Sequence, residues 1–277
     1  MKKTIIAGLL AAAANFATAG TVLVVVSDQD KLNLQDGKVM QTGFFLNELM
    51  EPVQTFIAAG HTVVFATPSG KAPSADQKSD DVSFFGGNEK ARQESKALLA
   101  TLKLTAKTGS PAISLAQVKK IGYDKFDAVF VPGGHIPMQD LLKNKDLGEL
   151  LTNFHNNSKT TGLTCHGTIA LLSTVPDAHG YVAKLEAGQR PQPSQWIYKD
   201  YKMTAFTNEE EEQAKGFLNG GHMKLFPQDG LVAAGANFVE AKAWSENVVE
   251  DRELISGQNP QSAKAVALAM VKKLARP

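Results

Sequence analysis

Cys165 is the single cysteine of the chain, and its surroundings favour a chemical role. It lies in residues 164–168, which read TCHGT and join a short β-branched run to an apolar run of helical character. Such a sharp strand-to-helix turn, a nucleophile elbow, exposes a reactive side chain at the end of a sheet. The partial positive charge at the start of a helix would favour the thiolate, the reactive form of cysteine. A buried structural cysteine is the alternative that composition alone would favour.

The two residues after Cys165 fit this interpretation. Gly167 would relieve crowding where the turn is tightest. His166 could act as the base that takes the thiol proton, although adjacent side chains on a sharp turn need not point together. These residue types predict a cysteine nucleophile with an imidazole partner.

A second candidate loop follows another apolar run. Residues 131–135 read VPGGH, so that Gly133 and Gly134 come directly after a predicted buried strand. Paired glycines allow a tight turn and bring backbone N–H groups close to a ligand. An ordinary strand-to-helix turn has the same composition and is the alternative. His135, beside the glycines, could line the same site.

The elements that must position these loops alternate between strands and helices. Strands are expected at residues 21–27, 62–67, 126–131, 159–164 and 202–206, and helices at 43–60, 88–104, 137–157, 169–175 and 261–274. This alternation predicts an α/β protein whose parallel sheet is covered by helices on both faces. Ligands bind at the carboxyl ends of the strands in such sheets, which is where both candidate loops lie.

The N-terminus has the three-part layout of a secretory signal peptide. Two lysines precede an apolar run over residues 5–14, and small residues at 17–19 complete a cleavage signal. The run is shorter than the roughly 20 residues that span a bilayer, although a retained anchor is the alternative. We therefore expect a signal peptide over residues 1–19, cleavage after Ala19, one domain over residues 20–277, and a periplasmic or secreted location.

The composition gives little reason to expect a charged partner or a cofactor. The chain has 29 basic and 28 acidic residues and a formal net charge of +1, so neither nucleic acid nor an anionic membrane is an expected partner. The histidines lack the spacing of a metalloprotease motif or of a paired ligand set, and no Walker A or dinucleotide glycine pattern occurs. We expect no catalytic metal and no cofactor.

Several segments together resemble the ThiJ/PfpI superfamily, which includes the Parkinsonism-associated deglycase and the intracellular protease for which it is named. Besides the two candidate loops, residues 43–52, 62–70, 204–208 and 254–262 are similar, in order, to its branch of glyoxalase III-like enzymes and heat-shock chaperones. Thr168 departs from the pattern, since many relatives have proline or another small residue there. The resemblance implies a flavodoxin-like, doubly wound sheet with a nucleophile elbow, in a domain like that of class I glutamine amidotransferases.

The same resemblance implies roles for individual residues. Cys165 would be the nucleophile and His166 its triad partner, while Glu48 on the first long helix would exchange protons with the sulfur or a bound substrate. The N–H groups of Gly134 and His166 would form an oxyanion hole. The residues expected to bind the oxyanion or the substrate are Gly133, Gly134, His135 and Gly167.

The acidic residues could instead have structural roles. The third triad acid would fall within residues 209–212, and we favour Glu211. The same run also suits the first turn of a helix capped by Thr207 or Asn208, so at most one of these acids is expected to be catalytic. Glu48, on a largely apolar helix, could instead be an exposed residue.

The leading hypothesis is a glutathione-independent, glyoxalase III-like hydro-lyase that converts an α-oxoaldehyde such as methylglyoxal into a 2-hydroxy acid through a Cys165 hemithioacetal. One alternative is a stress-response holdase chaperone or thiol redox sensor, because an exposed low-pKa thiol oxidises readily. A peptidase, amidase or deglycase is another. A homodimer is expected from the resemblance, and the Pro/Gln-rich residues 189–196 could form a lid or part of a dimer contact.

Export gives a direct test. The protein purified from the envelope or medium of its native cells should begin at Gly20, which N-terminal sequencing would show. An intact Met1 on that protein would contradict cleavage.

Overall fold

The computed structural model describes residues 19–191 and 195–275, and its centre is a seven-stranded sheet. The strand order is β10-β11-β7-β6-β1-β4-β5, and every pair is parallel except β10 with β11. The sheet strands are β1 (Thr21–Val25), β4 (Thr62–Thr67), β5 (Ile113–Ser114), β6 (Ala128–Val131), β7 (Thr160–Thr164), β10 (Val248–Asp251) and β11 (Leu254–Gly257). The predicted flavodoxin-like α/β fold with a mostly parallel sheet is confirmed.

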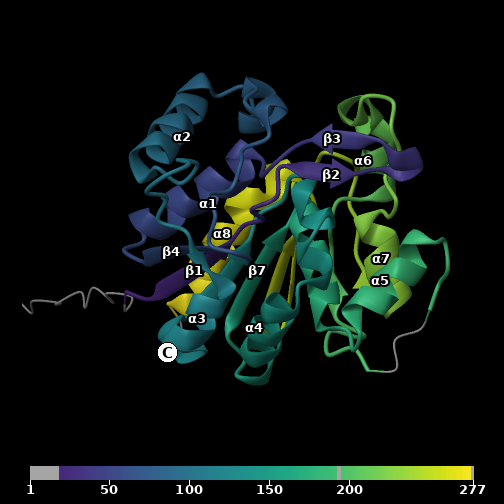
Figure 1. Cartoon of the computed structure of the whole chain (residues 1–277). Coiled ribbons are helices and arrows are strands. Elements are labelled where there is room, and N and C mark those ends of the chain that lie inside the picture. The colour runs from purple at the N-terminus through teal and green to yellow at the C-terminus, as the bar shows by residue number, and fades with distance from the viewer. Residues whose placement is uncertain (1–18, 192–194, 276–277) are drawn as a thin grey trace, which may run out of the picture.

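Helices cover both faces of the sheet (Figure 1). The α-helices are α1 (Leu46–Ala58), α2 (Glu89–Leu102), α3 (Leu115–Ile121), α4 (Lys145–Asn156), α5 (Ala178–Glu186), α6 (Asn208–Gln213), α7 (Pro227–Ala234) and α8 (Ala263–Leu274). The 3-10 helices are η1 (Gln35–Gly37), η2 (Gln77–Ser79), η3 (Val82–Phe85), η4 (Tyr123–Lys125), η5 (Ile136–Met138), η6 (Leu141–Lys143), η7 (Cys165–Thr174), η8 (Ala214–Leu218) and η9 (Pro260–Ser262).

Two apolar cores lie on opposite sides of the sheet. Val22 and Val24 of β1 pack with α1 and α8, which lie side by side, whereas Leu23 and Val25 pack with α4 and η7. Successive residues of a strand point to opposite faces. A strand buried on both faces therefore reads as the continuous apolar run seen in the sequence.

Two expected elements differ from the structure. The helix expected over residues 137–157 is instead the 3-10 helices η5 and η6 followed by α4, because the Asn144 side chain accepts a hydrogen bond from Leu147 N and starts a new helix there. The strand expected over residues 202–206 is shorter. It forms β8 (Lys202–Met203), which pairs with β9 (Asn237–Phe238) outside the main sheet. The hairpin of β2 (Lys31–Asn33) and β3 (Val39–Gln41) was not anticipated.

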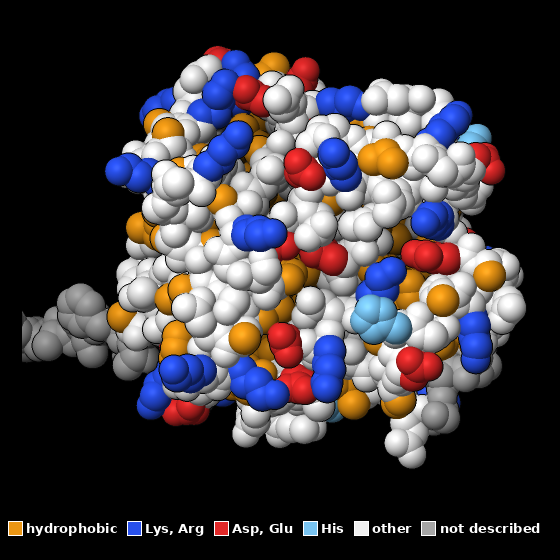
Figure 2. Space-filling model, in the orientation of Figure 1, with side chains coloured by type: hydrophobic (Ala, Val, Ile, Leu, Met, Phe, Trp, Pro, Cys, Tyr) orange, Lys and Arg blue, Asp and Glu red, His pale blue; other side chains and the backbone are white. Residues whose placement is uncertain are grey.

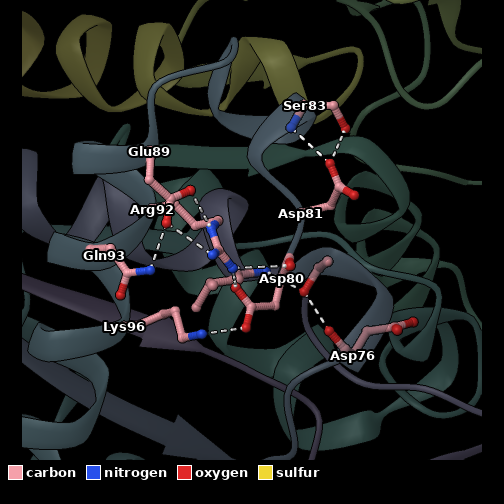
Figure 3. Close-up of polar contacts among 10 residues, drawn as sticks. Asp76, Asp80, Asp81, Ser83, Glu89, Arg92, Gln93 and Lys96 are labelled. Carbon is pink, nitrogen blue, oxygen red and sulfur yellow. Dashed lines mark hydrogen bonds and ion pairs between the residues drawn. The ribbon is translucent and has the colours of Figure 1, made fainter.

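A charged network fixes the segment that leads into α2. Arg92 pairs with both Asp80 and Glu89, and Lys96 Nζ lies 2.5 Å from the other carboxyl oxygen of Asp80 (Figure 3). These contacts join α2 to Asp80, which lies between η2 and η3. Phe84 of η3, the next segment, borders the candidate site.

The surface shows no single-sign field on the face in Figure 2, where acidic and basic side chains are interspersed. Among the described residues, no helix has the length and apolar character needed to cross a membrane. The expected signal peptide lies outside the described residues except for Ala19, and residues 192–194 of the Pro/Gln-rich segment lie outside them as well.

Gly148 of α4 packs directly against η7. A Cβ there would overlap the carbonyl oxygen of Ser173 and lie 2.9 Å from its carbonyl carbon. Helix propensity alone would make Gly148→Ala stabilising by about 1 kcal/mol, but overpacking typically costs ~1–3 kcal/mol. We expect a net fall in the free energy of unfolding, measured by urea denaturation. Gly216→Ala in η8 is the control, since a Cβ there meets nothing within 4 Å; a Gly148→Ala protein at least as stable as the parent would contradict the close contact.

Candidate active site

Cys165 adopts a left-handed backbone conformation, with a φ of 57°, where β7 meets η7. A non-glycine residue in this region carries strain of about 1–3 kcal/mol, which persists only where its surroundings hold it. Because β6 and β7 are parallel neighbours, the turn brings the thiol next to the loop that follows β6. The residue is only 2% exposed, so the nucleophile elbow presents its thiol to a buried site.

Two glycines make room for this turn. At Gly133, a Cβ would overlap a carboxyl oxygen of Glu48 and lie 2.7 Å from Cβ of Cys165. At Gly167, a Cβ would overlap the carbonyl oxygen of Pro132. Gly167 thus allows the elbow to pack against the end of β6, as its position in the turn suggested, but it does not line the pocket.

His166 connects the thiol to an acid. Its Nδ1 lies 3.3 Å from Sγ of Cys165, and its Nε2 lies 2.9 Å from Oε1 of Glu211. When Glu211 is ionised, Nε2 donates its proton to the carboxylate, which leaves Nδ1 free to accept the thiol proton. Burial lowers the pKa of His166 to about 3, so the ring is neutral at pH 7. The two adjacent side chains therefore do point together.

Helix α6 places neighbouring acids in different surroundings. Thr207 and Glu210 form a capping box, in which each side chain accepts the backbone N–H of the other residue. The second oxygen of Glu210 accepts hydrogen bonds of 2.8 Å from Trp244 N and Asn259 Nδ2. Glu211 instead faces the imidazole, and burial raises its pKa to about 7. The structure thus brings Glu211 to the histidine and confirms Thr207 as the cap of the helix, with Glu210 as its partner in the capping box.

Glu48 reaches the thiol from α1 and is fully buried, so the exposed alternative is wrong. Burial raises its pKa to about 8, while the thiol of Cys165 and the backbone N–H groups of Gly133 and Gly134 partly oppose this rise. Neither carboxyl oxygen has a hydrogen-bond partner of good geometry within the described ranges. Such a carboxyl holds its proton at neutral pH and can offer it to an incoming group.

The expected lowering of the thiol pKa is wrong, because the site is buried. Burial and the neighbouring charge of Glu48 raise the pKa of Cys165, and the backbone N–H of His166 only partly opposes them. The cost of desolvating a thiolate exceeds what the start of the short helix η7 returns. The thiolate must therefore form by transfer of the proton to a neighbouring base, for which His166 Nδ1 is positioned.

A small pocket lies over these groups, and five of its twelve described lining residues are phenylalanine or tryptophan. The aromatic residues are Phe45, Phe84, Phe206, Phe217 and Trp244. Lys78 Nζ donates to the Phe217 carbonyl at 2.6 Å, which ties the segment before η3 to η8 beside the pocket. These side chains come from separate segments with no shared sequence pattern, so the sequence analysis missed them.

His135 also lines the pocket and is only 4% exposed. Its ring lies 4.3 Å from that of His166, centroid to centroid, and neither of its nitrogens has a hydrogen-bond partner among the residues the structure covers. Burial lowers its pKa to about 4, so the ring is neutral at pH 7. A neutral imidazole with both nitrogens unpaired can donate to or accept from a ligand.

The buried carboxyl of Glu48 predicts a pH-dependent stability. A pKa raised from 4.5 to about 8 means that the native state holds a proton which the unfolded state releases, so stability falls as pH rises between these values. Glu48→Gln, which mimics the protonated acid, should therefore gain stability over the parent between pH 5 and pH 9, by about 2 kcal/mol or more. Urea unfolding at a series of pH values measures this. Glu94→Gln on the exposed face of α2 is the control, and parallel curves for Glu48→Gln and the parent would contradict the prediction.

Comparison with known proteins places this site in a family. The chain matches the family described as ThiJ/PfpI family-like over residues 39–212. It is 30% identical over 263 residues to the glutathione-independent glyoxalase hsp3101 of Schizosaccharomyces pombe, covering 92% of this chain and 96% of that protein. It is 25% identical over 260 residues to the protein/nucleic acid deglycase HchA of Staphylococcus aureus, covering 91% and 79%.

A solved structure agrees in fold. The crystal structure of glyoxalase III from Candida albicans matches with a TM-score of 0.68 at 21% identity, covering 91% of this chain and 96% of that one. The sequence matches extend over nearly the whole chain and include the elbow and the glycine loop. The chain therefore belongs to the ThiJ/PfpI superfamily.

Proposed function

We propose that the protein is a glutathione-independent, glyoxalase III-like hydro-lyase that converts an α-oxoaldehyde such as methylglyoxal into a 2-hydroxy acid. The observation that carries the proposal is the buried Glu48 carboxyl, which lines one small pocket together with Cys165 and with His166, itself bonded to Glu211. The similarity to hsp3101, itself named a glutathione-independent glyoxalase, supports it.

In the first step, His166 Nδ1 accepts the thiol proton while the sulfur of Cys165 adds to the aldehyde carbon. The product is a hemithioacetal, in which the sulfur–carbon bond replaces one bond of the carbonyl. The developing oxyanion would be received by the backbone N–H groups of Gly134 and His166. The buried Glu211 stabilises the imidazolium that forms, at 2.9 Å from its Nε2.

In the second step, His166, neutral again once the thiol proton has passed to the oxyanion, removes the proton on the former aldehyde carbon while Glu48 donates its proton to the neighbouring ketone oxygen, which gives an enediol. His166 then returns its proton to the former ketone carbon, and the Glu48 carboxylate takes the proton of the hydroxyl on the former aldehyde carbon, which gives a thioester of the 2-hydroxy acid. Water then hydrolyses the thioester, releases lactate in the case of methylglyoxal, and restores the thiol. The sequence consumes one water and needs no electron acceptor and no glutathione.

The pocket favours a small, uncharged substrate. Five of its twelve described lining residues are phenylalanine or tryptophan, and none is lysine or arginine. So small and apolar a pocket suits a dicarbonyl better than an extended peptide, which weighs against a peptidase. The buried thiol with a raised pKa weighs against a redox sensor, which needs an exposed thiolate.

Two further parts of the proposal depend on the sequence. We propose that the protein acts after export, where independence from glutathione suits the compartment, and that it forms a homodimer as its family resemblance implies. Light scattering of the mature protein measures its oligomeric state, and a monomer would refute the second part.

The reaction is tested by incubating the reduced, mature protein with methylglyoxal, without glutathione, and measuring consumption and chiral lactate. The parent should produce lactate. Cys165→Ala should fall to the uncatalysed rate, and Glu48→Gln should lose about 10²–10⁴-fold in kcat because a positioned acid is missing.

Glu94→Gln in α2 serves as the matched acid control and should keep the parental rate, because its side chain is exposed and far from the pocket lining. Absence of lactate from a parent protein whose Cys165 is a titratable free thiol would refute the proposed reaction.

A further inference from the structure

Three buried side chains beside the thiol could together hold a metal ion. One ring nitrogen each from His135 and His166 and one carboxyl oxygen of Glu211 lie within 4.8 Å of one another. Two imidazoles and a carboxylate form a ligand set that suits zinc, with a fourth position left for water or another ligand. The three residues come from different segments, so no sequence motif predicts the cluster.

The cluster contains buried polar atoms that a bound ligand could satisfy. His135 Nδ1 and Nε2 and Glu211 Oε2 have no hydrogen-bond partner among the described residues, although these residues are 4% and 1% exposed. A buried polar atom without a partner costs about 1–3 kcal/mol. A dicarbonyl in the pocket could satisfy His135. Glu211 does not line the pocket, so a pocket ligand would leave its second oxygen without a partner, whereas an ion held by the cluster could bind it.

The geometry requires only a small adjustment. Ligand atoms around a tetrahedral zinc are roughly 3.3 Å apart, since each bond is about 2.0–2.1 Å long. The His166 Nε2 to Glu211 Oε1 distance is 2.9 Å, and the widest separation in the cluster is bounded by 4.8 Å. Rotation of His135 can close that gap, because its ring makes a tilted contact with His166 and neither of its nitrogens has a hydrogen-bond partner among the described residues.

No lining side chain of the pocket opposes a cation. None of the described lining residues is lysine or arginine. Glu211, itself one of the proposed ligands, is an acid only 1% exposed, and a divalent cation would compensate its charge.

We propose that His135, His166 and Glu211 form a binding site for a divalent transition metal, best suited to zinc, and that occupation of this site switches off the thiol. Zinc at Nε2 of His166 forces the ring proton onto Nδ1, which faces the sulfur at 3.3 Å. Nδ1 can then donate a hydrogen bond but can no longer accept the thiol proton. The inhibitory half of the inference rests on the proposed function, and the binding half does not.

The binding half is tested by titrating the full, reduced protein with zinc chloride in competition with a chromogenic chelator. The parent should bind one zinc per chain. His135→Ala should bind at least tenfold more weakly because a ligand is missing. Cys165→Ala should bind within about threefold of the parent, because the thiol is not one of the three ligands. His222→Ala, which removes an exposed histidine, should bind as the parent does.

Cobalt provides a readout that a merely structural role would not change. Co²⁺ bound to the parent should show ligand-field absorption without a thiolate-to-metal charge-transfer band, and His135→Ala should lose that spectrum while a cooperative urea transition shows that it is still folded. The site is overturned if the parent fails to bind zinc, if His135→Ala binds with parental affinity, or if Cys165→Ala loses binding.

If zinc binds as expected but the parent produces no lactate, the proposed function fails and the site stands. If both hold, zinc should inhibit lactate formation in the parent.

Discussion

The left-handed backbone at Cys165 is the constraint on which the site depends. With a φ of 57°, the chain turns at the nucleophile itself, and close packing must hold that strained conformation. Gly133 and Gly167 permit the packing, since a Cβ on either would overlap a neighbouring atom. The parallel pairing of β6 with β7 supplies the loop against which the elbow rests. Tight packing around a strained turn also excludes water, and the electrostatics of the site follow from that exclusion.

Burial decides which groups carry protons. In water Glu48 would be ionised at pH 7, but in this site its pKa of about 8 keeps it neutral. His166, with a pKa of about 3, is neutral as well. A neutral acid and a neutral base on either side of one thiol can exchange protons with a substrate without leaving an isolated charge in a low-dielectric site. Of the nearby groups, Glu211 has the pKa closest to 7, at about 7. It contacts the thiol only through the imidazole of His166.

The parts of the site that depend on local sequence were predictable, and those that depend on tertiary packing were not. The elbow and the glycine loop follow from residue types at two strand ends. The third acid could be narrowed only to residues 209–212, because the choice of Glu211 depends on where α6 begins and which side faces the imidazole. The aromatic wall, including Phe84 and Trp244, comes from loops that meet only in the folded chain. The predicted direction of the Cys165 pKa shift was wrong because a sequence shows where a helix begins but does not show how far a side chain is removed from water.

The capping box at the start of α6 also fixes the register of the helix. Thr207 and Glu210 fix the residue at which the helix begins, and consecutive helical residues are about 100° apart around the axis. The cap therefore fixes the directions of two adjacent acids at once, so that Glu210 holds the loop of Asn259 while Glu211 meets the imidazole. An insertion before Thr207 would leave the spacing between Thr207 and the two acids unchanged. An insertion between Thr207 and Glu210 would turn both acids about 100° around the axis and away from their present partners, so this short stretch should tolerate changes of length far less than the chain around it.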